Sequence, residues 1–165
     1  MKKLIYCIIS IILFLHTSNC SGYKPIFASS KLKFKIEDYQ IKGEKRLGKI
    51  IYSKLYNSSG LNADDPSLQS VTLTIEVSKE KIPTVKNNAG KILEYKISLD
   101  SNIIVKNYLT NDKILDKNFV SSLSYKIQDQ YSETIKQENI TINNLINKIY
   151  QDLVIQLSEK MLTEW

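Results

Sequence analysis

A strict alternation of apolar and polar residues between positions 71 and 77 limits what this chain can fold into. Four aliphatic residues there alternate with threonines and a glutamate: Val71, Leu73, Ile75 and Val77. Such alternation is typical of a β-strand with one buried face. Pro83 indicates either the end of this strand or a position on a sheet edge. The residues Asn87-Asn88-Ala89-Gly90 predict a turn, after which alternation resumes from Leu93 towards Val105, so we expect a β-hairpin.

Two further elements are predicted before the hairpin. Leu32, Phe34 and Ile36 alternate with three lysines and predict a half-buried strand. Residues 44–56 predict a helix with one apolar stripe, formed by Leu47, Ile50, Ile51 and Leu55. Residues 57–68 are rich in Asn, Asp, Ser and Gly and predict a loop.

The chain after the hairpin predicts one more strand and a long helix. A turn at Asn111-Asp112 precedes a strand expected over 114–125. Residues 132–161 predict a helix, with an alternative start near Asn139. Its apolar stripe holds Ile142, Leu145, Ile146, Ile149, Leu153, Leu157 and Met161.

These elements together predict an α+β fold in the order β-α-β-β-β-α. We expect a two-layer sandwich, with about four strands in a mainly antiparallel sheet and both helices packed on one face.

The N-terminal residues have the layout of a secretory signal. Two lysines precede an apolar run from Leu4 to Leu15, and a short polar segment follows before Cys20. The run is shorter than the roughly 20 residues that a membrane span needs. We therefore expect a signal peptide over 1–19 and a single domain over 20–165, of which 20–30 form an extended leader. An uncleaved anchor helix is the alternative.

Cysteine usage favours a lipid-anchored protein. The chain has two cysteines, and Cys7 would leave with the signal, so Cys20 would begin the mature chain without a disulfide partner. An N-terminal cysteine has a ready use as a lipid acceptor. Ser21 directly follows the predicted lipid acceptor. In enterobacteria-like sorting an aspartate there favours retention in the inner membrane, so a serine favours the outer membrane.

The residue inventory argues against an enzyme. The single histidine, His16, lies in the predicted signal, so the mature chain has no imidazole for acid–base or metal chemistry. No phosphate loop, dinucleotide fingerprint or nucleophile elbow is present. We expect no enzymatic activity, no metal and no cofactor. The formal charge of +6 is a mild basic excess, and an exported chain without a basic helix is not expected to bind nucleic acid.

Several stretches resemble one known family. Cys20 is followed by Ser-Gly-Tyr-Lys-Pro-Ile-Phe, residues 92–97 read Ile-Leu-Glu-Tyr-Lys-Ile, and Ser124-Tyr125 precede the final helix. With the order of elements, these stretches are similar to the LptE family of lipopolysaccharide-assembly lipoproteins. The sequence departs from the usual pattern at Ser21, which is an insertion, and at Thr17 and Asn19 in the lipoprotein box.

The resemblance implies a non-catalytic function at the outer membrane. It implies a protein that is lipid-anchored through Cys20, faces the periplasm, plugs and helps assemble the barrel LptD, and binds lipopolysaccharide. Family positions that bind lipopolysaccharide correspond to Lys86 before the hairpin turn and Lys136 early in the last helix. Lys91 is added because it lies across the turn from Lys86.

Other interpretations remain open on the sequence alone. The three lysines are also consistent with ordinary solvated loop residues. A free periplasm-facing lipoprotein that binds a small apolar or anionic ligand would use the same anchor and sheet. A structural protein that tethers envelope layers would need a wall-binding element, which the sequence does not show.

Overall fold

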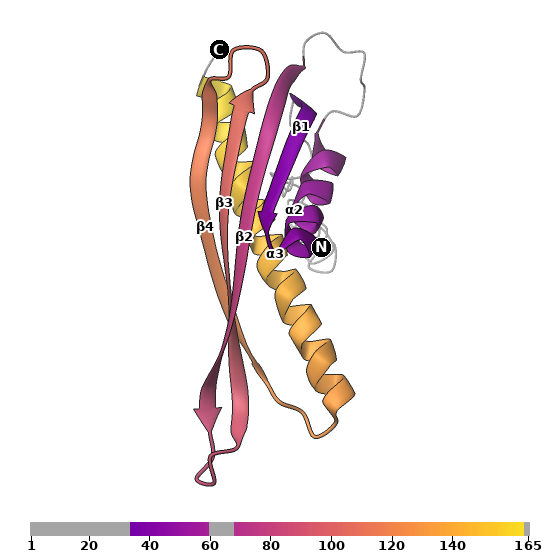
Figure 1. Cartoon of the computed structure of the whole chain (residues 1–165), viewed down its shortest axis with the longest axis vertical. Helices are drawn as coiled ribbons and strands as arrows, with labels where there is room; N and C mark the ends of the chain where they lie inside the picture. The colour runs from indigo at the N-terminus through magenta and orange to yellow at the C-terminus, as the bar shows by residue number, and fades with distance from the viewer. Residues whose placement is uncertain (1–33, 60–67, 164–165) are drawn as a thin grey trace, which may run out of the picture. The chain divides into compact units, whose positions relative to one another are not determined.

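The computed structural model describes residues 34–59 and 68–163. The elements along the chain are β1 (Phe34–Gly43), α2 (Lys45–Ser58), β2 (Gln69–Lys86), β3 (Ile92–Asn107), β4 (Lys113–Lys126) and α3 (Tyr131–Thr163) (Figure 1). The four strands form one sheet in the order β1-β2-β3-β4. The predicted α+β fold and the order of its elements are therefore confirmed.

The sheet is mainly antiparallel, as predicted, but it is mixed because one strand pair is parallel. β2, β3 and β4 form an antiparallel meander, as their short connections require. β1 runs parallel to β2, from Phe34 opposite Gln69 to Gly43 opposite Val77. The parallel pairing follows from the chain path, because α2 carries the chain back along the sheet before β2 begins.

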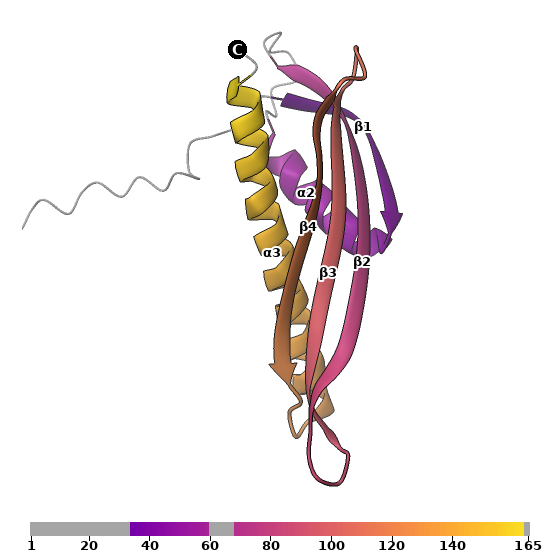
Figure 2. The same cartoon turned by 90° about the vertical axis from the view of Figure 1, so that its left-hand side faces the viewer.

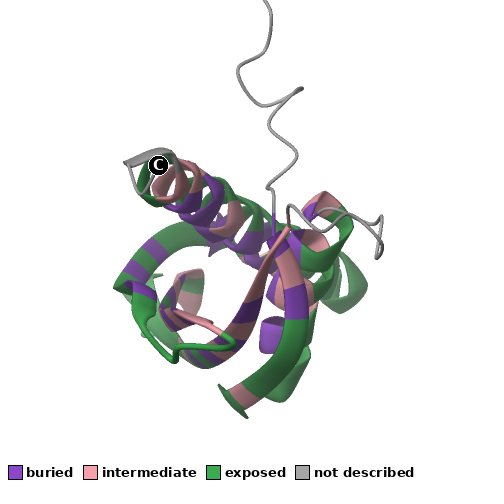
Figure 3. Ribbon diagram, turned by 90° about the horizontal axis from the view of Figure 1, so that it is seen from above, coloured by how far each residue is buried: buried purple, intermediate pink, exposed green. Residues whose placement is uncertain are grey.

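Both helices lie on one face of the sheet, as the sequence predicts. α2 packs against β1 and β2, and α3 runs along β4 (Figures 1 and 2). Buried and exposed segments alternate along the strands, and the helices turn their buried sides to the sheet (Figure 3). The fully buried centre of the core is aliphatic and includes Leu47, Ile51, Leu55, Leu73, Ile75, Ile97, Leu99, Ile103, Leu145 and Ile146. Removal of these side chains from water is the main force that holds the two layers together.

Two glycines set the junction between β1 and α2. Gly43 ends β1 with a φ of +68°, and a Cβ there would collide with the carbonyl oxygen of Val77. That carbonyl accepts a hydrogen bond from the Glu44 N–H at 2.8 Å, which closes the turn into α2. Gly48 lies against the side chain of Ile41, so α2 can pack close to β1. Glycine in a helix costs about 1 kcal/mol relative to alanine, and here Gly48 allows the close packing of α2 on β1.

The boundaries of several elements differ from the predictions. β1 begins at Phe34 and continues to Gly43, well past Ile36, with a register irregularity between Ile36 and Asp38. α2 extends to Ser58, so the expected loop starts later. In α2, Ile50 is only partly buried.

The two open questions about long elements are also answered. β2 continues through Pro83 to Lys86. Because β1 pairs with β2 only as far as Val77, Pro83 occupies an edge position on that side, where a missing N–H costs no ladder bond. α3 is continuous over Tyr131–Thr163, so the start near Asn139 is wrong. The predicted signal, Cys20, the leader and Leu32 lie outside the described residues.

Candidate functional site

The end of the β2–β3 hairpin, residues 82–93, is the candidate site and is called the hairpin end below. Its turn projects beyond the end of β4 and the start of α3 (Figure 1). β4 pairs with β3 only up to Lys126 opposite Glu94, so the turn itself has no neighbouring strand. The site therefore presents its side chains to the surroundings on more than one side.

The hairpin turn is fixed by its own sequence. The side-chain oxygen of Asn87 accepts hydrogen bonds from the N–H groups of Ala89 at 3.0 Å and Lys91 at 2.9 Å. The Asn87 N–H donates to the Lys91 carbonyl at 2.9 Å. Gly90 adopts a φ of +78°, which glycine tolerates without strain. Lys86 and Lys91 are thereby held on either side of one turn.

The structure brings two of the three predicted lysines together. Lys86 and Lys91 are exposed, and neither forms an ion pair within the described part of the chain. Lys136 is on α3, where its ammonium lies 3.7 Å from Glu133. Glu138 faces β2, and a residue two positions earlier in a helix points to nearly the opposite side. Lys136 therefore lies near the same end of the sheet but does not join the hairpin pair.

Apolar side chains accompany the lysines. Ile82, Val85 and Leu93 on the hairpin end are each about two-fifths exposed. Tyr131 and Ile135, in the first turns of α3, are also exposed. Free ammonium groups next to uncovered apolar side chains make a surface that suits an amphiphile with anionic groups.

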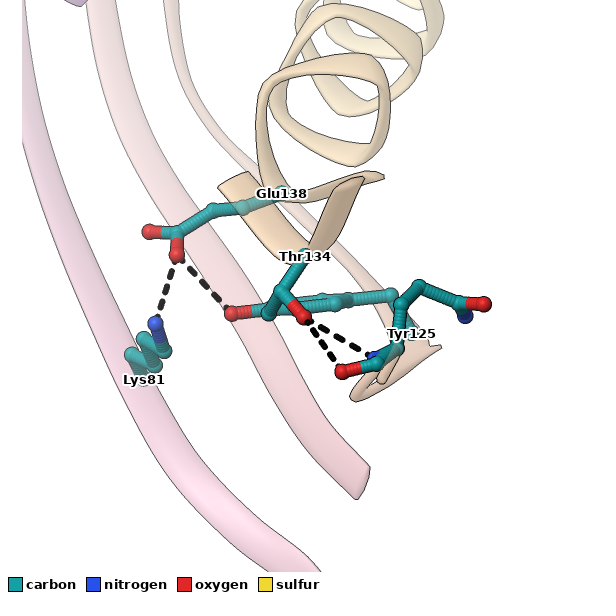
Figure 4. A network of polar contacts seen from close by, with 5 residues as sticks. Lys81, Tyr125, Thr134 and Glu138 are labelled. Atoms are coloured by element: carbon teal, nitrogen blue, oxygen red, sulfur yellow. Dashed lines mark hydrogen bonds and ion pairs between the residues drawn. The ribbon is translucent and has the colours of Figure 1, made fainter. Parts of the chain in front are cut away.

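A polar cluster at the base of the hairpin connects it to α3, and the sequence did not predict it (Figure 4). The ammonium of Lys81 on β2 donates to Oε2 of Glu138 on α3 at 2.6 Å. The hydroxyl of Tyr125 on β4 donates to the same oxygen at 2.9 Å. The Lys81 ammonium also lies 4.5 Å from the ring centroid of Tyr95 on β3, within the range of a cation–π contact. One lysine thus joins all three long strands to the helix.

The ionisation of this cluster follows from its contacts. Burial opposes the charge on Lys81, but its hydrogen bonds to Glu138 and Tyr125 outweigh burial and raise the pKa of Lys81 above its usual value. Burial likewise opposes the charge on Glu138, but hydrogen bonds from Lys81 and Tyr125 lower the pKa of Glu138. Burial raises the pKa of Tyr125. At neutral pH the cluster is therefore an ion pair with a neutral phenol beside it.

A second contact secures the loop between β4 and α3. The hydroxyl oxygen of Thr134 accepts a hydrogen bond from the Gln128 N–H at 2.9 Å, and this hydroxyl also lies 3.3 Å from the Gln128 carbonyl oxygen. The start of α3 is thus attached to the loop by Thr134 and to the hairpin base by Glu138 (Figure 4). The base of the hairpin is therefore attached to α3 and to the loop before it, whereas the turn at residues 87–90 has no neighbouring strand.

Across residues 34–59 and 68–163, no group of three His, Cys, Asp or Glu side chains is arranged to hold a metal ion. Neither helix in these segments is long and apolar enough to span a bilayer. Cys20, the predicted lipid acceptor, lies outside the described residues.

The fold is shared with solved lipoprotein structures. No family model matches the sequence, and no curated protein matches it. The rare lipoprotein B from Shewanella oneidensis aligns with a TM-score of 0.54 and 12% identity, over 78% of this chain and 99% of that one. Lipoprotein B from Nitrosomonas europaea aligns with a TM-score of 0.55 and 10% identity, over 79% of this chain and 85% of that one. A minor lipoprotein from Acinetobacter baumannii aligns with a TM-score of 0.53 and 14% identity, over 79% of this chain and 94% of that one.

At these identities the likeness establishes a common fold. The alignments cover most of this chain and most of each of the three lipoproteins, so the likeness concerns the overall fold.

Proposed function

We propose that this chain is a non-enzymatic outer-membrane lipoprotein of the LptE type, which plugs and helps assemble the barrel LptD and binds lipopolysaccharide. Rare lipoprotein B is a name used for the LptE family, so the shared fold and the sequence resemblance favour the same assignment. The observation that carries the proposal is the hairpin end, where Lys86 and Lys91 flank a projecting turn beside exposed apolar residues.

Lipopolysaccharide has the two chemical features that this surface would recognise. Its phosphates are anions that lysine ammonium groups attract as mobile point charges. Its acyl chains would cover apolar side chains that are otherwise left in water, such as Ile82, Val85 and Leu93. Because Lys86 and Lys91 have no ion pair within the described segments, neither must give up a partner to bind a phosphate.

The face of the sheet opposite the helices supports the role of a plug. Its exposed and half-buried positions are mainly polar, and on neighbouring strands they include Thr72, Thr74, Glu76, Asn102, Asn118 and Ser122. The interior of large outer-membrane barrels is also polar. A sheet with such a face could lie in a barrel lumen through hydrogen bonds and water-mediated contacts.

The binding of lipopolysaccharide is tested by reversing charge at the turn. The variant Lys86→Glu/Lys91→Glu should bind purified lipopolysaccharide about 25-fold more weakly, at about 1 kcal/mol or fivefold per lysine near an anionic surface. Lys49→Glu/Lys148→Glu reverses the same number of charges at exposed sites on α2 and in the middle of α3, and should bind within about twofold of the native chain. Equal losses in both proteins would show that only net charge matters, and the hairpin site would be rejected.

The partnership is tested by affinity purification from native membranes in mild detergent. The proposal predicts that the chain returns with LptD in a stable complex, and that depletion of the chain prevents assembly of the barrel. Recovery of the chain without a barrel protein would contradict the proposal and favour a free ligand-binding lipoprotein.

A further inference from the structure

One flank of α2 carries a row of cations and aromatic rings, called the α2 stripe below. Its members are Lys45, Lys49, Tyr52 and Tyr56. Successive members are three or four residues apart, which places them on one side of a helix with 3.6 residues per turn. Three of them are exposed, and Tyr52 is partly buried. The stripe therefore lies beside the side of α2 that packs on the sheet.

The α2 stripe faces away from α3. On the other flank of α2, the ammonium of Lys54 lies 6.0 Å from the ring centroid of Tyr150 on α3. Lys54 is two positions from both Tyr52 and Tyr56, and such residues point to nearly opposite sides of a helix. Figure 1 shows β1 and α2 at the side of the sheet away from β4. The stripe thus lies on a flank that α3 does not cover.

Tyr39 on β1 extends the stripe to the edge of the sheet. Its ring stacks on that of Tyr52, with centroids 4.1 Å apart, and the rings of Tyr52 and Tyr56 lie 5.8 Å apart. β1 is first in the sheet order and pairs only with β2. Tyr39 and Tyr56 remain 47% and 45% exposed. Rings that already hold each other in place lose less side-chain freedom when a partner binds.

The surface around the stripe is strongly basic. Between positions 42 and 58 the only carboxylate is that of Glu44, and the basic residues are Lys42, Lys45, Arg46, Lys49 and Lys54. Within the described residues, Lys45 and Lys49 form no ion pair. The first turn of α2 has no acidic side chain, and the helix dipole disfavours cations there. The stripe is therefore complementary in charge to an acidic surface.

The composition of the stripe distinguishes its ligand from that of the hairpin end. At the hairpin end, exposed aliphatic side chains accompany the lysines and suit acyl chains. On β1 and α2 the exposed large apolar side chains are both tyrosines, Tyr39 and Tyr56. A phenol combines a large contact area with a hydroxyl that needs a polar partner. Phenols beside unpaired lysines suit a protein surface with carboxylates better than they suit hydrocarbon.

The stripe is also continuous with the polar face of the sheet. On β1, Gln40 lies opposite Thr74 of β2, and Lys42 lies opposite Glu76. These pairs belong to the face that is proposed to contact the barrel lumen, and β1 is the edge that joins this face to α2. One polar surface therefore runs from the sheet, around β1, to the α2 stripe.

We propose that the α2 stripe and Tyr39 bind an acidic patch on the inner wall of the barrel, so that the barrel and lipopolysaccharide use separate surfaces of the chain. The inference rests on the proposed function, from which the barrel partner is taken. The polar interior of an outer-membrane barrel can supply carboxylates to the two lysines and hydrogen-bonding groups to the phenols. Tyrosine is enriched in protein–protein interfaces for this combination of contacts.

Matched charge reversals test whether the two surfaces act separately. Each variant of the full chain is purified from native membranes in mild detergent, and the ratio of barrel protein to chain is measured. Lys45→Glu/Lys49→Glu should lower this ratio about tenfold, because it places like charges against the acidic wall, and should bind purified lipopolysaccharide within about twofold of the native chain. Lys86→Glu/Lys91→Glu makes the same change in net charge and should give the opposite pattern.

A second pair of variants tests the aromatic part of the surface. Tyr56→Ala should lower the recovery of barrel protein about tenfold, since buried tyrosines are frequent hot spots. Tyr108→Ala removes a ring of similar exposure, 52%, from the turn between β3 and β4, and should leave the recovery within about twofold. All these sites are exposed, so each variant should unfold at nearly the same urea concentration as the native chain.

Several results would overturn the proposal. Unchanged barrel recovery with Lys45→Glu/Lys49→Glu, or equal losses in both charge-reversal variants, would do so, as would equal effects of Tyr56→Ala and Tyr108→Ala. Loss of lipopolysaccharide binding by Lys45→Glu/Lys49→Glu, with barrel recovery unchanged, would assign the stripe to lipopolysaccharide instead. A native chain that recovers no barrel protein would reject the proposed function and this inference together. Equal recovery by the native chain and the stripe variants would reject the inference alone.

Discussion

Lys81 on β2 and Glu138 on α3 form an ion pair of 2.6 Å, and the aromatic rings of Tyr95 and Tyr125 lie beside its ammonium. The two residues are separated by 57 positions in the sequence. Their contact fixes how the first turns of α3 meet the base of the hairpin. The pair is only partly exposed, so loss of one partner leaves the other poorly solvated.

The first prediction is that Glu138→Gln destabilises the chain by about 1–3 kcal/mol, because a charged acceptor shared by two donors is lost. Urea unfolding of the native and variant chains at neutral pH measures the difference. Glu133→Gln is the matched control, since Glu133 pairs with Lys136 at the surface at 3.7 Å. The control should cost less than about 1 kcal/mol. Equal losses of stability in the two variants would show that the Lys81–Glu138 pair stabilises the chain no more than an exposed ion pair does.

The second prediction concerns the pH dependence of this pair. The pKa of Glu138 is lower in the folded chain than its ordinary value of 4.5. Its contribution to stability is therefore present above that value and is lost as pH falls through the folded pKa. The pKa of Lys81 is raised above 10.5, so its contribution is present below that value and is lost as pH rises through the folded pKa.

The stability difference between the native chain and Glu138→Gln should thus be largest at neutral pH. It should shrink in acid, as Glu138 becomes protonated, and in strong base, as Lys81 loses its charge. Unfolding curves over a pH series measure it. A difference that stays constant down to a pH well below 4.5 would contradict the assignment.

The order of the elements was predictable, because the central part of most elements has a clear apolar period. β2 and β3 bury alternate side chains over Val71–Val77 and 97–105, and α3 buries aliphatic side chains at helical spacing, whereas β4 buries a less regular set that includes Leu115, Phe119 and Tyr125. β1 was predicted too short for a physical reason. The irregularity between Ile36 and Asp38 changes the phase of the strand, so that Tyr39 and Ile41 no longer continue the alternation of Phe34 and Ile36.

Only the part of the candidate site at the hairpin turn could be predicted from the sequence. Lys86 and Lys91 flank a turn that their own neighbours encode, so their proximity follows from the sequence. The separation of Lys136 depends on the angle at which α3 meets the sheet, and that angle comes from packing over the whole core. The Lys81 cluster gave no local signal, because its four members come from four different elements.

The third prediction tests the junction at Gly43. Gly43→Ala should destabilise the chain by about 3 kcal/mol, since it combines a positive φ with a collision against the Val77 carbonyl. Gly90 also has a positive φ, but a Cβ there would meet nothing within 4 Å. Gly90→Ala should therefore cost only about 1 kcal/mol. Thermal unfolding of both variants measures the comparison, and a larger cost at Gly90 would refute the role of the Val77 contact.

The fourth prediction tests the contact of α3 with the core. Leu145 is fully buried, so Leu145→Ala should cost about 2–5 kcal/mol through lost burial and the cavity left behind. Ile140→Ala, on the same helix at a position that is 42% exposed, should cost less than about 1.5 kcal/mol. Similar values for the two variants would mean that α3 does not pack as described.

The last prediction tests the lipid anchor on which the proposed function depends. If Cys20 is the acceptor, mass spectrometry of the mature chain should find Cys20 at the N-terminus with lipid attached. Cys20→Ala should then move the chain from the membrane fraction to a soluble or unprocessed form, because stable anchoring needs more than one buried acyl chain. Cys7→Ala changes a residue that would leave with the signal, so it should be processed and anchored like the native chain. A mature chain that keeps residues 1–19 and an unmodified Cys20 would favour the uncleaved anchor helix instead.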